Sequence, residues 1–505
     1  MAGSNMKKLK FWVLPFILLT VQAQADYRDD IGYNQLLSEL SINTPDGTGI
    51  KVTQVEAAVG ATDFNTGSWM PNTASPQFTG KTITDQSVPS SSGISSHATG
   101  VGQLFYGNVG SMASGIFDVD IYSASNWLQS GFLSAGSTLV PSVSGSRIAN
   151  HSWVGELVNT HDVLDILRRI DWLVEEDEFI QVVGVNNGSV QKPLVSNGFN
   201  VIAVGRADGQ HEKGTMVLDS VYTSDRSGLD LVVPLGTTSS ATAVVSGAAA
   251  MLIEQAQSIA EGPVTVISNG DTIYNGERSE VIKAIMMAGA DRVTQNFHTT
   301  AQITDYRADV INQTQNGLDT RFGAGQLNVY HNYQIMDAGQ QSSMQDGGAA
   351  TVDWLGWDYD GNFGGAQGSN EIASYRFATT ENDGMQLAVS LVWNIDIEDN
   401  RLPGFNPSAT LHNLDLFLYD ITDGNEDLFA SSTSTIDNTE NLWVVLDGGR
   451  NYELRVVAVG DEAFNWDYAL AWRASSFAPV PVPAGFWFFL TGLLGLVRVR
   501  FFSES

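Results

Sequence analysis

The strongest constraint on the fold is a change in hydrophobic periodicity near residue 340. Between about 47 and 340, short apolar runs alternate with helix-like stretches, whereas beyond 350 strand-like runs follow one another. Strands separated by helices indicate a parallel sheet covered on both faces. Strands separated only by turn residues indicate an antiparallel β-sandwich. The sequence therefore predicts an α/β domain over 26–340 and an all-β domain over 350–475.

The same pattern predicts individual strands and helices of the first domain and the linker that follows it. Runs rich in Val and Ile, such as "GIKVTQVE", "EFIQVVGV" and "LDLVVPL", predict strands of the first domain. "THDVLDILRRIDWLVEE", "SSATAVVSGAAAMLIEQAQSIA" and "RSEVIKAIMMAGADRV" predict helices. The polar, glycine-rich "GQQSSMQDGGA" near 339 to 350 predicts a linker.

The charge balance and the absence of cysteine exclude several classes of function. The chain has 56 acidic and 25 basic residues, a formal net charge of -31 and no cysteine. Such a surface repels nucleic acid and anionic lipid headgroups, so we expect no nucleic-acid partner. Disulfides, thiol nucleophiles and Cys-ligated metal sites are also excluded.

The N-terminal stretch has the pattern of a secretory signal peptide. "KKLKFWVLPFILLTVQAQADY" combines a basic start, an apolar run and small residues at Ala23 and Ala25. The run is too short for a comfortable membrane span. We therefore expect a signal peptide over 1–25 and export of the chain.

The C-terminal segment, 479–505, also has a sorting pattern. A Pro-rich hinge leads into an apolar run from Ala484 to Val497, followed by arginines. With Pro481-Val482-Pro483 at the hinge, it resembles the PEP-CTERM sorting signals of Gram-negative bacteria. The resemblance implies an exosortase-like partner and a secreted or cell-surface location. The alternative is a short membrane anchor, although the run falls short of the ~20 residues of a span. In either case only the tail would contact the membrane.

A hydroxyl-rich helix start provides a candidate nucleophile. In "TTSSATAVVSG" the hydroxyls lie where the first helical N–H groups are unpaired and the helix dipole is positive, which favours an anion. The stretch resembles the nucleophile motif of the subtilisin-like serine peptidases. Counting back eight from Gly247 selects Ser239 and not Ser240. Thr237 and Ala243 stand where the family has glycine and proline.

Two further motifs resemble the base and the acid of the same family. "SSHATGVGQLFYG" places His97 in the catalytic position. "GIKVTQVEAAVG" places Glu56 where the family has an aspartate at the end of a strand, and Asp63 is the second candidate. The acid of such a triad orients the imidazole and stabilises the imidazolium. A glutamate is longer by one methylene, which moves the carboxylate by over ~1 Å unless the backbone compensates.

The resemblance also implies an oxyanion donor and a substrate strand. In "VVGVNNGSV", alignment of Gly188 with the family motif selects Asn186, with Asn187 as the alternative. "ANHSW" resembles the strand that pairs with extended substrate, so Ser152 and Trp153 are expected beside the specificity pocket.

Together these motifs imply a subtilisin-like doubly wound parallel sheet and a serine endopeptidase that acts on polypeptides without a required cofactor or a metal in its site. The C-terminal domain resembles the jelly-roll domain of some alkaline subtilases, whose acidic turns would accommodate structural Ca²⁺. Two alternatives stay open. One is an impaired peptidase fold that binds peptide or surface polymer without cutting, consistent with Glu56, Thr237 and Ala243. The other is a purely structural envelope protein.

Overall fold

The computed structural model describes residues 26–60, 66–364, 370–379, 384–399, 404–460 and 465–476. The expected signal peptide, the C-terminal sorting segment and Asp63 therefore lie outside the described residues. Among the helices that the structure describes, none has the length and apolar character needed to span a bilayer.

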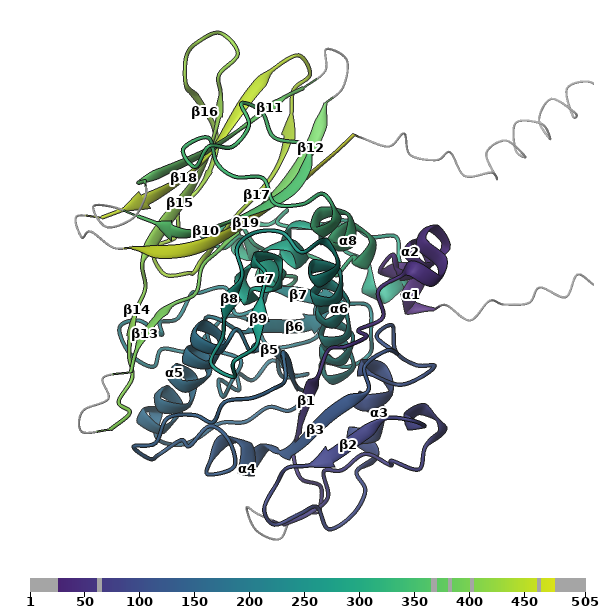
Figure 1. Ribbon diagram of the computed structural model, residues 1–505. Helices are drawn as coiled ribbons and strands as arrows, with labels where there is room; N and C mark the ends of the chain where they lie inside the picture. The colour runs from purple at the N-terminus through teal and green to yellow at the C-terminus, as the bar shows by residue number, and fades with distance from the viewer. Residues whose placement is uncertain are drawn as a thin grey trace, which may run out of the picture.

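The first domain is built on a seven-stranded sheet in which every neighbouring pair is parallel, as the sequence predicts (Figure 1). Its order is β2-β3-β1-β4-β5-β6-β7, so β1 and β4 lie side by side at the centre. The strands are β1 (Val52–Glu56), β2 (Thr82–Asp85), β3 (Asp118–Ser123), β4 (Ile148–His151), β5 (Ile180–Gly184), β6 (Ile202–Arg206) and β7 (Leu231–Val233).

Helices cover both faces of this sheet. On one face, α3, α6, α7 and α8 enclose the largest apolar core, and on the other α4 and α5 enclose a second core. The α/β layering predicted from the alternating pattern is thus confirmed. The helices are α1 (Tyr27–Asp30), α2 (Tyr33–Leu40), α3 (Ser96–Phe105), α4 (Ala124–Leu128), α5 (Thr160–Asp177), α6 (Thr238–Ile259), α7 (Ser279–Ala288) and α8 (Val329–Asp337).

The long helix α6 lies close against the middle of the sheet because its residues are small. A Cβ atom on Gly184 of β5 would sit 2.7 Å from Oγ1 of Thr242 on α6, so only glycine fits there. Helix α6 begins at Thr238 and ends at an Ala260 cap with a left-handed φ of 53°. This close packing fixes the first turn of α6 at the edge where the strands end.

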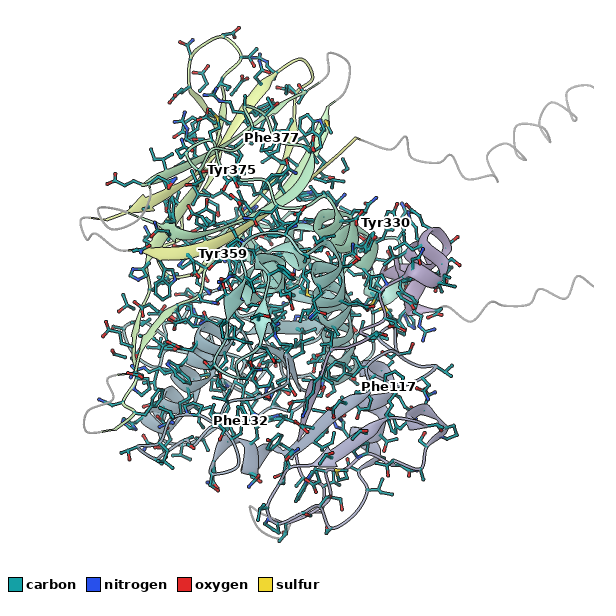
Figure 2. All side chains as sticks on the ribbon, viewed as in Figure 1. Phe117, Phe132, Tyr330, Tyr359, Tyr375 and Phe377 are labelled. Carbon is teal, nitrogen blue, oxygen red and sulfur yellow. The ribbon has the colours of Figure 1, made fainter. Side chains whose placement is uncertain are left out.

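The second domain is a sandwich of two four-stranded antiparallel sheets, again as predicted. Their orders are β10-β19-β12-β17 and β11-β18-β15-β16, and their facing side chains form a separate apolar core. Tyr375 and Phe377 belong to that core (Figure 2). The strands are β10 (Leu355–Phe363), β11 (Ile372–Ala378), β12 (Met385–Val392), β15 (Asn413–Asp420), β16 (Asp427–Ser432), β17 (Thr439–Leu446), β18 (Asn451–Val459) and β19 (Trp466–Ser476).

Contacts that hold the sandwich against the α/β domain include an apolar one and a hairpin. Val392, Ala469 and Ala471 of β12 and β19 share the large core with α6 and α7. The hairpin of β13 (Asp396–Glu398) and β14 (Ser408–Thr410) reaches down to α5, where Ile397 joins the second core (Figure 1). The segment predicted as a linker is itself paired, since Gln340 forms a parallel bridge with Trp357.

Candidate active site

The candidate site lies at the carboxyl edge of the parallel sheet, where open α/β folds place their ligands. Glu56 is the last residue of β1, and Val55 is in register with His151, the last residue of β4. The next residue of each strand is therefore Glu56 on one side and Ser152 on the other. Helix α6 brings Ser239 to the same edge, because the Ser239 hydroxyl contacts Ser152.

Glu56 and His97 form a hydrogen-bonded pair. Nδ1 of His97 lies 2.7 Å from Oε2 of Glu56, whose side chain is fully buried, whereas the His97 side chain is 44% exposed. The capping residue Ser95, whose hydroxyl accepts from the Ala98 N–H at 3.1 Å, starts α3 so that His97 faces the end of β1. Since a carboxylate can only accept a hydrogen bond, we assign the proton to Nδ1 of His97, which leaves Nε2 to act as a base.

The pairing changes the ionisation of both groups. Burial raises the pKa of Glu56 above its ordinary value, while the hydrogen bond from His97 opposes that rise. The hydrogen bond to Glu56 raises the pKa of His97 above 6.5 and outweighs burial, which lowers it. A raised pKa makes the imidazole a stronger base.

A buried chain of hydrogen bonds holds the Glu56 carboxylate in place. The Gln54 amide donates to Oε1 of Glu56 at 2.7 Å and to the carbonyl of Ala98 at 3.0 Å. The hydroxyl of Tyr106, at the end of α3, donates to Oε1 of Gln54 at 2.6 Å. Sequence reasoning missed both positioning residues. The available clue was Gln54 itself, which lies two residues before the acid and so faces the same side of the strand.

Ser239 is the second residue of α6 and is held against the residue that follows β4. Its hydroxyl donates to the carbonyl of Ser152 at 3.2 Å, and the Ser152 hydroxyl donates back to the carbonyl of Ser239 at 3.0 Å. Across the described part of the chain, no hydrogen bond joins Ser239 to His97. Glu56 and His97 are thus in contact, and Ser239 lies at the same edge of the sheet with its hydroxyl turned to Ser152.

Thr237, which departs from the family pattern, caps the helix. Its hydroxyl oxygen accepts from the Ser240 N–H at 3.2 Å and lies 2.9 Å from the Ser240 hydroxyl. A threonine cap satisfies one of the unpaired donors of the first turn. Ser240 is therefore engaged in capping, whereas Ser239 points to the strand edge.

Two neighbouring asparagines differ in what they contact. The Asn186 amide donates to the carbonyl of Val190 in its own loop at 2.8 Å. Asn187 instead accepts from the Thr238 N–H through Oδ1 at 2.9 Å, which places its amide nitrogen beside the start of α6. In the residues that the structure describes, the N–H of Ser239 donates no hydrogen bond. The geometry therefore brings the alternative, Asn187, to the nucleophile, while the amide of Asn186 is committed elsewhere.

The side chains expected to form the specificity pocket are buried. Ser152 is 3% exposed, and its hydroxyl lies 2.9 Å from Oδ1 of Asn150 as well as 3.0 Å from the carbonyl of Ser239, so its single proton is shared between two acceptors. Trp153 is 8% exposed and packs in the second core, with its ring 5.9 Å from that of His151. Neither side chain lies open to the surface, and their expected place beside a specificity pocket stays a prediction. The backbone N–H and C=O of Trp153 have no partner within the described residues.

The described residues also contain no group of three His, Cys, Asp or Glu side chains arranged to hold a metal ion.

Comparison with known proteins gives structural likenesses only. No family model and no curated protein matches the sequence. Among solved structures, the prenylagaramide maturation protease PagA is 16% identical, with 59% of this chain and 98% of that chain covered and a TM-score of 0.38. The PatG macrocyclase in complex with peptide is 13% identical, with 62% and 98% covered and a TM-score of 0.38. MycP1 from Mycobacterium smegmatis is 14% identical, with 62% and 87% covered and a TM-score of 0.35. Sequence identities and TM-scores this low give no evidence of function.

Proposed function

We propose that this chain is a subtilisin-like serine endopeptidase with a Glu56/His97/Ser239 triad. The observation that carries the proposal is an imidazole hydrogen-bonded to a buried carboxylate at the same sheet edge as a serine in the first turn of a helix. The order along the chain, acid then histidine then serine, is the subtilisin order and differs from that of chymotrypsin.

Each residue has a defined part in the proposed reaction. The Ser239 hydroxyl turns from Ser152 to Nε2 of His97, which takes its proton as Oγ attacks a peptide carbonyl. Glu56 stabilises the imidazolium that forms. The N–H of Ser239 and the amide of Asn187 donate to the oxyanion. His97 then protonates the departing amine, and water attacks the acyl-enzyme with His97 as base.

An extended polypeptide suits the unpaired backbone beside the nucleophile. Trp153 follows Ser152 beyond the end of β4, and its backbone N–H and C=O make no hydrogen bond to any described residue. A substrate strand that pairs there would bring its carbonyl carbon toward Ser239, in the manner of β-strand addition. From the sequence patterns of the two ends, we further propose that the enzyme is exported and then sorted, or anchored, at the surface of a Gram-negative cell.

A fluorophosphonate probe tests the proposal directly, because it labels only an activated serine. We expect labelling of the purified chain at Ser239 and its loss in Ser239→Ala. Ser240→Ala is the matched control, since it removes the adjacent hydroxyl and should retain labelling. No labelling of well-folded protein would refute the peptidase proposal.

A second candidate function is binding of peptides without cleavage. It is favoured by the hydrogen bond of the Ser239 hydroxyl to Ser152 in place of His97, and by a glutamate at the acid position. This function predicts saturable peptide binding by protein that neither labels nor hydrolyses, with affinity unchanged in Ser239→Ala.

A further inference from the structure

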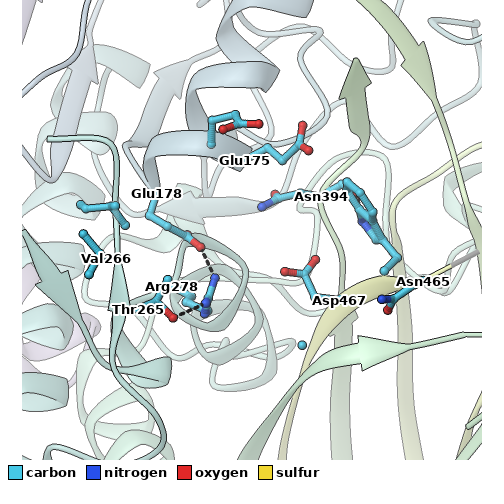
Figure 3. A pocket seen from close by; sticks show the side chains of 12 residues that line it. Glu175, Glu178, Thr265, Val266, Arg278, Asn394, Asn465 and Asp467 are labelled. Atoms are coloured by element: carbon cyan, nitrogen blue, oxygen red, sulfur yellow. Dashed lines mark hydrogen bonds and ion pairs between the residues drawn. The ribbon is translucent and has the colours of Figure 1, made fainter. Parts of the chain in front are cut away.

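A cavity of about 320 Å³ lies between the two domains, away from the candidate active site (Figure 3). It is formed where the end of α5 and the start of α7 meet the first residues of β19. Glu176 and Asn465 at its mouth are exposed, so it opens to the surface. The lining residues are Glu175, Glu176, Glu178, Thr265, Val266, Ile267, Arg278, Gly361, Asn394, Asn465, Trp466 and Asp467.

The cavity and the candidate active site lie at opposite edges of the parallel sheet. Helix α5 ends at Asp177 and leads into β5 at Ile180, so the three glutamates of the cavity precede that strand. Asn187 and the triad lie beyond the carboxyl ends of the strands. A five-residue strand is roughly 16 Å long, so a ligand in the cavity does not touch the catalytic groups.

The lining carries more carboxyl groups than basic groups. It contains four carboxyl groups and one guanidinium, that of Arg278, which is paired with Glu178 at 2.7 Å. In the part of the chain that the structure describes, no ion pair involves Glu175, Glu176 or Asp467. The Glu175 carboxylate accepts from the N–H of Ile397 at 3.0 Å, and Asp467 accepts from the Tyr359 hydroxyl at 2.7 Å.

The amide oxygen of a buried residue, Asn394, also faces this cavity without a donor. Asn394 is 5% exposed, and its amide nitrogen donates to the hydroxyl of Ser279 at 3.2 Å and to Glu280 at 3.3 Å. Its Oδ1 accepts no hydrogen bond from any described residue, and Figure 3 shows the amide directed into the cavity. A buried acceptor left in this state favours a ligand that supplies N–H donors.

The chain's own Arg278 shows how this environment holds a guanidinium. Its Nη1 donates to Glu178 and its Nη2 to the Thr265 hydroxyl at 2.8 Å (Figure 3), while the group lies 4.3 Å from the ring centre of Tyr359. The rest of the cavity repeats these elements, with carboxylates at Glu175 and Asp467 and an aromatic ring at Trp466. Carboxylates and an aromatic face together recognise organic cations.

We propose that this cavity binds the cationic side chain of an arginine or lysine residue of a polypeptide partner. The volume suits a single side chain, since it lies at the lower end of ligand-pocket sizes. A metal ion is the weaker occupant, because the described residues include no group of three acidic or histidine ligands arranged to hold one.

Binding of a cation here releases protons. Burial raises the pKa of Glu175 to about 9, so this carboxyl holds a proton near neutral pH, and burial also raises the pKa of Asp467 above its ordinary value. An incoming positive charge lowers both pKa values and expels protons. The other titratable groups that face or adjoin the cavity are Glu176, Glu178, Glu280, Arg278, Tyr359 and Asp396.

Calorimetry on the full chain tests the proposal, with Nα-acetyl-arginine amide as probe and the neutral isostere Nα-acetyl-citrulline amide as its control. We expect saturable binding of the arginine probe, at least tenfold weaker binding of citrulline, and heats that vary with the ionisation enthalpy of the buffer. Nα-acetyl-lysine amide should also bind.

Two isosteric variants locate the site. Glu175→Gln and Asp467→Asn keep their hydrogen bonds to Ile397 and Tyr359 and should each weaken arginine binding at least tenfold. Asp162→Asn, which replaces a carboxyl by an amide at the exposed start of α5, should leave binding unchanged. Equal binding of citrulline, or arginine affinity unaltered in both cavity variants, would overturn the proposal. Because the cavity is remote from Ser239, either result leaves the peptidase proposal standing.

Discussion

The carboxylate of Glu56 and the imidazole of His97 lie 2.7 Å apart across 41 residues of sequence, one fully buried and the other partly exposed. A short charge-assisted contact of this kind fixes which ring nitrogen carries the proton. The longer glutamate side chain thus reaches the histidine directly. If the chain is a peptidase, this pair determines the pH at which it begins to act.

We expect Glu56→Gln to abolish most of the activity. An amide that presents its N–H to Nδ1 stabilises the wrong tautomer and cannot stabilise an imidazolium, which costs about 10⁴-fold in kcat in a serine peptidase. In the variant, the rise of kcat/KM with pH should have its midpoint at or below pH 6.5, because the hydrogen bond that raises the pKa of His97 is lost. The pH profile of kcat/KM measures both effects, and an unchanged lower limb would contradict the assignment.

Glu56→Asp is the informative companion to that change. It keeps the charge but withdraws the carboxylate by one methylene, which breaks the 2.7 Å contact unless the strand moves. We expect a loss of about 10²-fold. A variant as active as the parent would mean that the carboxylate position does not limit catalysis.

Asn187→Ala should lower kcat by about 10²–10³-fold with little change in KM, because an oxyanion donor acts mainly in the transition state. Asn186→Ala is the matched control. Its amide is bonded to Val190 within the loop, so its loss should have a much smaller effect on kcat. Steady-state kinetics of the two variants on one peptide substrate decide between them, and the reverse ranking would return the role to Asn186.

Gln54→Leu should loosen the acid of the triad. The change leaves Oε1 of Glu56 and the hydroxyl of Tyr106 without their buried partner, which costs about 1–3 kcal/mol for an unsatisfied group. It should also raise the pKa of Glu56 further, since the Gln54 hydrogen bond lowers it. Urea unfolding reports the stability loss.

Tyr106→Phe separates packing from positioning. It removes only the outer hydrogen bond of the chain and keeps the contact of Gln54 with Glu56, so about 1 kcal/mol should be lost with little effect on the pH profile of kcat/KM. A Gln54→Leu variant that loses stability but keeps the parental pH profile would show that Gln54 is merely structural.

The architecture could be predicted from the sequence because hydrophobic periodicity reports directly on burial. The alternating pattern indicated the parallel sheet, and the strands from Leu355 onward indicated the antiparallel sandwich. Helix α6 was expected to start at its hydroxyls, and it begins at Thr238. The sequence does not predict the β13–β14 hairpin that contacts α5, because strands of three residues are too short to show a hydrophobic periodicity.

Details of the site depend on contacts that no local pattern encodes. Consecutive Asn186 and Asn187 are chemically identical, and only the path of the loop decides which of them meets Thr238. Trp153 follows a serine in an expected substrate strand, yet the alternation of side chains along the strand directs its ring into the core beside His151. Sequence spacing locates such a segment but does not decide which side chain faces the ligand.

Glu440 predicts a loss of stability as the pH rises from about 4.5 to about 9. It lies buried in β17, where it accepts from the hydroxyl of Ser432 and the N–H of Ser434. Burial is the main cause that raises its pKa to about 9, against 4.5 for an ordinary glutamate. The folded chain therefore holds a proton there that the unfolded chain releases, and stability falls as pH rises from 4.5 to about 9.

Glu440→Gln removes this titration while keeping the shape of the side chain. Below pH 4.5 the Glu440 carboxyl is neutral in both the folded and the unfolded parent chain, so its stabilisation is fully present. Between pH 4.5 and about 9, the free energy of unfolding of the parent should fall by up to about 1.4 kcal/mol per pH unit relative to that of the variant. Urea unfolding at several pH values from 5 to 9 measures the divergence. Glu371→Gln, at an exposed position of the same domain, should follow the parent. Parallel curves for parent and Glu440→Gln would mean that Glu440 is ionised in the folded chain and that its hydrogen bonds outweigh its burial.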